Sequence, residues 1–63
     1  MKSFKVAYRG PDGRPRATVV SYTEELANDE ADAMEDRGIE VFDIVECKLG
    51  TPCETIAAMY EGK

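Results

Sequence analysis

Residues 4–22 read FKVAYRGPDGRPRATVVSY and predict a β-hairpin, around which the remaining elements can be placed. Apolar side chains at Phe4, Val6 and Tyr8 alternate with other residues over 4–9, which is the period of a strand buried on one face. In residues 10–15, Pro11 presets φ for a turn and Gly13 supplies a positive φ. The β-branched and aromatic residues that follow predict a second strand over 16–22.

The segment after the hairpin has the pattern of an amphipathic helix. Thr23 can cap the first turn, where Glu24 and Glu25 also suit the helix dipole. Arg37 suits the last turn, and Gly38 the left-handed stop. A narrow apolar stripe at helical spacing consists of Leu26, Ala27, Ala31 and Met34.

Residues 39–47 are an almost continuous apolar run, which predicts the most buried strand of the sheet. We expect Phe42 and Ile44 to face the helix. The order ββαβα then predicts an α+β fold, in which a three-stranded antiparallel sheet with the first strand in its centre is covered by the long helix. A sheet with one covering helix leaves its second face open to a short C-terminal helix or to a second protomer.

A short C-terminal helix is expected after Gly50. Thr51 is the predicted N-cap, Pro52 the first helical residue and Glu54 the partner that completes a capping box. The apolar face and the expected end of this helix are given by Ile56, Met59, Tyr60 and Gly62.

Length and composition exclude several classes of protein. The 63 residues allow one small domain, residues 1–63, with a small core. Two Cys and no His cannot supply the four ligands of a structural zinc site, so we expect no metal and no cofactor. No secretory signal and no apolar segment of membrane-spanning length is present, so a cytoplasmic protein with reduced thiols and no membrane partner is expected.

Negative charge gathers on the predicted long helix. The chain has 13 acidic and 8 basic residues, a net charge of −5, and seven of the acids fall within residues 24–36. Four of them have the spacing i, i+4, i+7, i+11, which places them in one row on a single helical face, and these are Glu25, Asp29, Asp32 and Asp36. Like charges at i,i+4 destabilise a helix by about 0.2–0.5 kcal/mol per pair. The row is either a solvated outer face or a docking face for a basic protein surface.

Positive charge gathers on the hairpin, at Lys5, Arg9, Arg14 and Arg16. These residues form a candidate secondary basic patch, and a basic β-ribbon can contact phosphates in a nucleic-acid groove. Four or five cations on an acidic protein make a small positive surface for phosphate contacts, so direct nucleic-acid binding is the weaker alternative. Another alternative is a structural homodimer that buries the open sheet face, with its seam at Val19, Val41 and Val45.

Catalytic arrangements are missing from the sequence. Cys53 at a helix start is the only activated nucleophile to consider, but no His can serve as its base, and Cys47 and Cys53 lack the redox spacing. The carboxylates lie on an exposed helix without a pocket to raise a pKa. We therefore expect a binding protein and no enzyme.

The tiny ββαβα plan, the dense acidic helix over 24–36 and the missing catalytic set resemble the small phage-encoded proteins that bind and inhibit host machinery, including anti-CRISPR proteins. The resemblance is to a class and covers only the overall layout; the basic hairpin departs from it, because a pure nucleic-acid mimic has no need of one. It implies a stoichiometric inhibitor that occludes a basic, nucleic-acid-handling surface of its partner.

Overall fold

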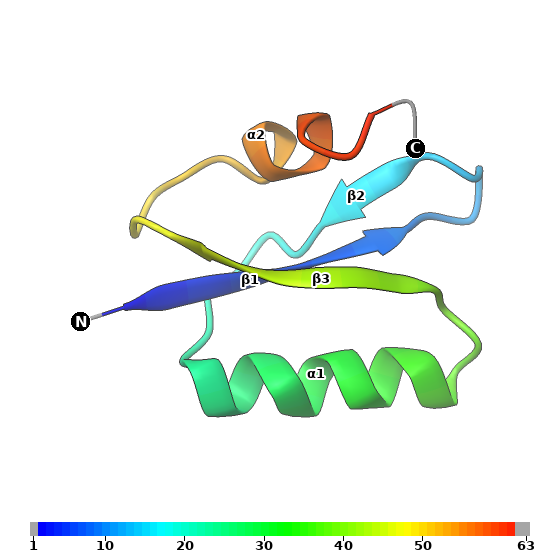
Figure 1. Ribbon diagram of the computed structural model, residues 1–63, viewed down its shortest axis with the longest axis horizontal. Coiled ribbons are helices and arrows are strands. Elements are labelled where there is room, and N and C mark those ends of the chain that lie inside the picture. Colours follow the sequence, from blue (N-terminus) through cyan, green and yellow to red (C-terminus); the bar gives the residue numbers. More distant parts are fainter. Residues whose placement is uncertain (1, 62–63) are drawn as a thin grey trace.

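A three-stranded antiparallel sheet lies between two helices in a computed structural model that describes residues 2–61 (Figure 1). The strands are β1 (Ser3–Arg9), β2 (Pro15–Ala17) and β3 (Val41–Cys47), in the sheet order β2-β1-β3. Helix α1 (Glu24–Asp36) covers one face of the sheet, and helix α2 (Cys53–Ala58) covers the other. The predicted ββαβα order and the central position of the first strand are confirmed.

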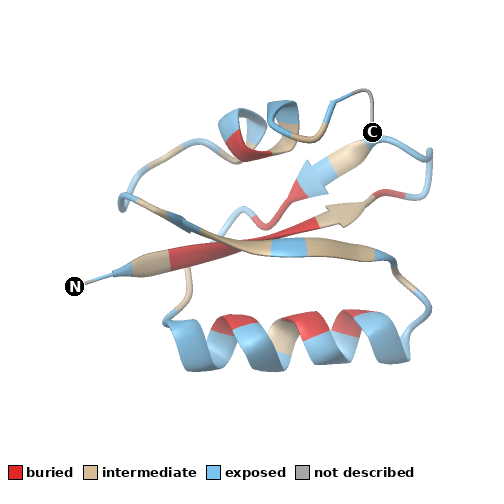
Figure 2. Ribbon diagram, viewed as in Figure 1, coloured by how far each residue is buried: buried red, intermediate tan, exposed pale blue. Residues whose placement is uncertain are grey.

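Strand β1 is buried on both faces. Phe4 and Val6 pack against Ala27, Ala31 and Met34 of α1. On the opposite face, Ala7 packs with Ala17 of β2 and Ile56 of α2. Figure 2 shows the buried residues of both helices on the sides that face the sheet. The expectation of a strand exposed on one face is wrong, because α2 closes the face on which Lys5 and Ala7 lie.

Strand β2 is much shorter than the predicted 16–22, because Lys5 is buried beside it. The Lys5 Nζ, in a residue only 2 % exposed, donates to the carbonyls of Thr18 (3.1 Å) and Val19 (2.6 Å). Because the Thr18 carbonyl accepts from Lys5, the Val6 N–H donates to the Thr18 hydroxyl instead, at 3.1 Å. The chain then bends outward at Val19 and Val20 and rejoins the sheet only at Tyr22, which pairs with Phe4.

The hairpin turn and helix α1 form as their local signals predict. The turn is closed by the Gly13 N–H, which donates to the Gly10 carbonyl at 2.9 Å, and Gly13 has φ of +82°. The Thr23 hydroxyl caps α1 by accepting from the Leu26 N–H at 3.3 Å. Gly38, also at φ +82°, ends the helix after Arg37. Leu26 itself is exposed, so it is not part of the packed stripe.

Strand β3 carries an irregularity at Phe42. Tyr8 pairs with Val41 and Ala7 with Asp43, so Phe42 is an extra residue without an opposite partner in β1. This bulge turns Phe42 towards the α2 side, whereas Ile44 packs on the α1 side. The expectation that both residues face the long helix is therefore correct for Ile44 and wrong for Phe42.

Helix α2 starts later than predicted. Its N-cap is Pro52, and the Thr51 hydroxyl instead donates to the Lys48 carbonyl at 2.7 Å, which closes the preceding turn. Ile56 is buried and Tyr60 packs beside it, but Met59 is exposed. The predicted end at Gly62 lies outside the described residues.

Candidate functional site

The four acids of the predicted row lie on the outer side of α1. At about 100° per residue, Glu25, Asp29, Asp32 and Asp36 fall within an arc of about 60°. The buried residues of the same helix, Ala27, Ala31 and Met34, lie on the diametrically opposite side. All four acidic residues are exposed, and the row extends about 16.5 Å along the axis at about 1.5 Å per residue.

These four carboxylates take part in no ion pair within residues 2–61. The ion pairs there join Arg9 to Glu40, Arg16 to Asp12 and Arg37 to Glu30, at 3.3, 3.3 and 3.5 Å. The last turn of α1 contains no basic residue. Asp36 therefore adds negative charge at the end of the helix where the dipole disfavours it. The row is a line of solvated negative charge without an internal counter-ion, and we name it the acidic row.

The chemistry available to the acidic row is electrostatic recognition. The row consists of exposed carboxylates. They can accept charge-assisted hydrogen bonds from lysine and arginine, and a line of them steers a basic partner towards its encounter. The row can therefore bind cations on another macromolecule.

The proposed basic patch on the hairpin does not exist as one surface. Lys5 is buried and bonded to main-chain carbonyls, so it cannot reach a partner. Arg9 is engaged three times: Nε with Glu40, Nη1 with the Gly13 carbonyl at 2.7 Å, and the guanidinium over the Phe42 ring at 5.1 Å. These contacts fix Arg9 as a structural residue.

Arg14 and Arg16 lie beside Asp12 in the hairpin. Asp12 accepts from the Arg14 main-chain N–H and pairs with the Arg16 guanidinium. The Arg14 N–H, followed by the charge of Arg16, holds the pKa of Asp12 below its usual 3.8. Of the four, Lys5 and Arg14 make no ion pair within residues 2–61, and of these two only Arg14 is exposed. Asp12 therefore offsets part of the positive charge of Arg14 and Arg16.

The proposed dimer seam is also covered. Val41 packs against the core cluster under α1, and Val45 packs against the cluster under α2. Only Val19 is exposed, at 81 %, in the bend after β2. Val41 and Val45 therefore lie on opposite faces of the sheet and do not form one seam with Val19, and α2 lies against β2 and β1.

The C-terminal segment is held against the sheet by an aromatic stack. The rings of Phe42 and Tyr60 lie 5.4 Å apart and 9° from parallel. Burial, and secondly the charge of Asp43, raises the pKa of the Tyr60 phenol above its usual 10.0. Burial, with a smaller effect from Glu30, likewise raises the pKa of Tyr22. These tyrosines are packing residues in the structure.

The two cysteines are free and half-buried. Both pack against the cluster of Ala7, Ala17 and Ile56, in the manner of small apolar residues. In residues 2–61 no three potential ligands among Cys, Asp and Glu gather to hold a metal ion. The same part of the chain has no helix whose length and apolarity would suffice to cross a bilayer.

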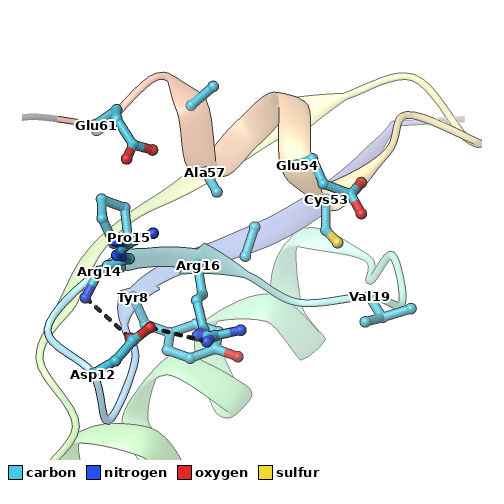
Figure 3. A pocket seen from close by; sticks show the side chains of 12 residues that line it. Tyr8, Asp12, Arg14, Pro15, Arg16, Val19, Cys53, Glu54, Ala57 and Glu61 are labelled. Carbon is cyan, nitrogen blue, oxygen red and sulfur yellow. Dashed lines mark hydrogen bonds and ion pairs between the residues drawn. The ribbon is translucent and has the colours of Figure 1, made fainter.

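Sequence reasoning missed a hollow of about 440 Å³ that runs along β2 beneath α2 (Figure 3). Its wall from α2 consists of Cys53, Glu54, Ala57 and Ala58, and Arg14 and Arg16 come from the hairpin. The sequence contained no signal for it, because the hollow depends on where α2 docks.

Comparison of the chain with known proteins finds no relative. The chain matches no protein-family model, no curated protein and no solved structure.

Proposed function

We propose that this chain is a small non-catalytic binding protein whose acidic row docks on a basic, nucleic-acid-handling surface of another protein and occludes it. The observation that carries the proposal is the exposed line of Glu25, Asp29, Asp32 and Asp36, which has no counter-ion within residues 2–61. This mode of action is the one implied by the resemblance to small phage-encoded inhibitors.

The distribution of charge supports a partner that is basic. Lys5 is buried, and Arg9 and Arg16 are paired with nearby acids. The acidic row makes no ion pair within residues 2–61, and its repulsions disfavour the helix. A surface shaped to hold a phosphate backbone presents spaced lysines and arginines, and carboxylates about 4.5–6 Å apart along a rigid helix can pair with them. Binding of this kind has fast, salt-sensitive association.

The test reverses charge on the row while it keeps the fold. The variant Asp29→Lys with Asp32→Lys changes the net charge by four units, and the matched control Glu46→Lys with Glu61→Lys makes the same change at exposed positions outside α1. Tagged wild-type protein and both variants are used for affinity purification and mass spectrometry from a lysate. Each partner recovered is then tested for nucleic-acid binding.

The expected result is a basic partner that is retained by the wild-type protein and by the control, and lost by the row variant. Added wild-type protein should also displace nucleic acid from that partner, less effectively as salt rises. Retention of every partner by the row variant refutes the proposal. Binding of DNA or RNA by this chain alone, with loss on Arg14→Ala, would favour the nucleic-acid alternative.

A further inference from the structure

The outer edge of β2 carries main-chain hydrogen-bonding groups that have no partner within residues 2–61. Arg14, Arg16 and Thr18 direct their main chain towards β1: the Gly10 N–H donates to Arg14, Tyr8 pairs with Arg16, and the Thr18 N–H donates to Val6. Because main-chain direction alternates in an antiparallel ladder, the Ala17 N–H and the carbonyls of Pro15 and Ala17 point away from the sheet. These groups form the free edge of β2.

The hollow under α2 lies along this free edge. Helix α2 forms its roof, with Ala57 and Ala58 between Glu54 and Glu61, and Figure 3 shows Glu54 and Glu61 at opposite ends. On the other side of β2 lies Arg16, which points away from α2, and Arg14 lies beside Pro15 at the start of the strand. An extended chain beside β2 could therefore form main-chain hydrogen bonds with the β2 edge. Its side chains would alternate between the surface of α2 and the surface on the opposite side of β2.

The edge of β3 offers no comparable place. There the outward N–H of Ile44 already donates to the Asp43 carboxylate at 2.8 Å. A side chain that takes up an edge N–H prevents an added strand from pairing with it. The edge of β2, in contrast, combines outward main-chain groups with a roofed hollow.

We propose that the edge of β2 and helix α2 together bind an extended segment of another protein by β-strand addition. Charge complementarity specifies the segment. Side chains that face α2 meet Glu54, then the small Ala57 and Ala58, then Glu61, so they follow the order basic, aliphatic, basic. The alternate side chains face Arg16 and its partner Asp12, with Arg14 at the start of the strand; the net charge there is positive, so these side chains are acidic.

A second copy of this chain does not fit the same place. In a two-fold pairing of β2 with β2, both α2 helices would lie on the same face of the joined sheet. The paired strands are about 4.8 Å apart, whereas packed helices need about 8–10 Å. Because α2 itself lines the hollow, the two helices would overlap.

The test uses two peptides of identical composition. The probe is the capped peptide Lys-Asp-Val-Asp-Lys, and the control is Asp-Lys-Val-Lys-Asp, which exchanges the two faces. Each is titrated into ¹⁵N-labelled protein to concentrations on the order of 1 mM, which detects binding of about 4 kcal/mol. The expected result is a shift of the Ala17 amide, slower hydrogen exchange at that amide, and binding at least tenfold tighter for the probe.

Two variants locate the site. Ala58→Arg fills the hollow and should weaken the probe at least tenfold, whereas Ala33→Arg, at an exposed position of α1, should leave it unchanged. Absence of binding, equal binding of both peptides, or insensitivity to Ala58→Arg overturns the proposal. A concentration-dependent shift of the Ala17 amide without peptide also overturns it, because that result identifies a second copy as the occupant.

Discussion

Ile56 anchors helix α2 on the sheet. It is the buried residue of α2, only 3 % exposed, and it lies against Ala7 and Ala17. Ile56→Ala removes three carbon atoms from this contact, which at about 0.8 kcal/mol each amounts to about 2.4 kcal/mol. The methyl side chains of the two alanines opposite are too short to fill the cavity, so the expected loss rises to about 3–4 kcal/mol.

This loss is large for a chain of 63 residues, whose total free energy of unfolding is expected to be about 3–9 kcal/mol. Urea unfolding followed by far-ultraviolet circular dichroism measures it. Ile56→Val should cost about 0.5–1.5 kcal/mol, and Met59→Ala, at an exposed position of the same segment, no more than about 0.5 kcal/mol. If Ile56→Ala costs no more than Met59→Ala, α2 does not cover the sheet as described.

Three further perturbations test other parts of the structure. Asp36→Lys should raise the free energy of unfolding by about 0.5–1 kcal/mol in urea titrations, because it removes repulsion with Asp32 and places a cation at the helix C-terminus. Because the pKa of Tyr60 is raised above 10.0 in the folded state, the unfolded chain loses that proton first as pH rises, so stability falls above about pH 10; Tyr60→Phe should lessen this fall in urea titrations at alkaline pH. Asp43→Ala frees the Ile44 N–H at the edge of β3 and should produce self-association in sedimentation equilibrium, where a strictly monomeric variant would contradict this account of the edge.

Elements with local signals could be predicted from the sequence. The turn at Gly10–Gly13 depends on residues adjacent in the chain, and so do the N-cap Thr23 and the stop at Gly38. The acidic row was predictable for the same reason, since helical spacing alone places its members on one side. Its exposure followed from the apolar stripe on the opposite side.

Features that depend on long-range contacts could not be predicted in this way. Lys5 has the position of an outward-facing strand residue, yet its ammonium reaches the carbonyls of Thr18 and Val19, and β2 ends where its pairing would otherwise continue. The bulge at Phe42 likewise depends on stacking with Tyr60, which is distant in sequence. Both departures lie on the face under α2, and the local pattern does not indicate that this face is covered.

The acidic row lies on the side of α1 opposite to its packing residues, so substitutions in the row can change binding without weakening the packing of the fold. Helix α1 is held by Ala27, Ala31 and Met34 on the side that faces the sheet, and the row touches none of this packing. Charge changes in the row therefore relieve repulsion without opening a cavity, and a loss of binding in such variants reports on recognition and not on unfolding. Lys5 behaves in the opposite way, because its replacement leaves the buried Thr18 carbonyl without a donor and disturbs the hairpin itself. The acidic row can thus be altered freely to test function, whereas Lys5, one of the four cations of the candidate basic patch, belongs to the fold.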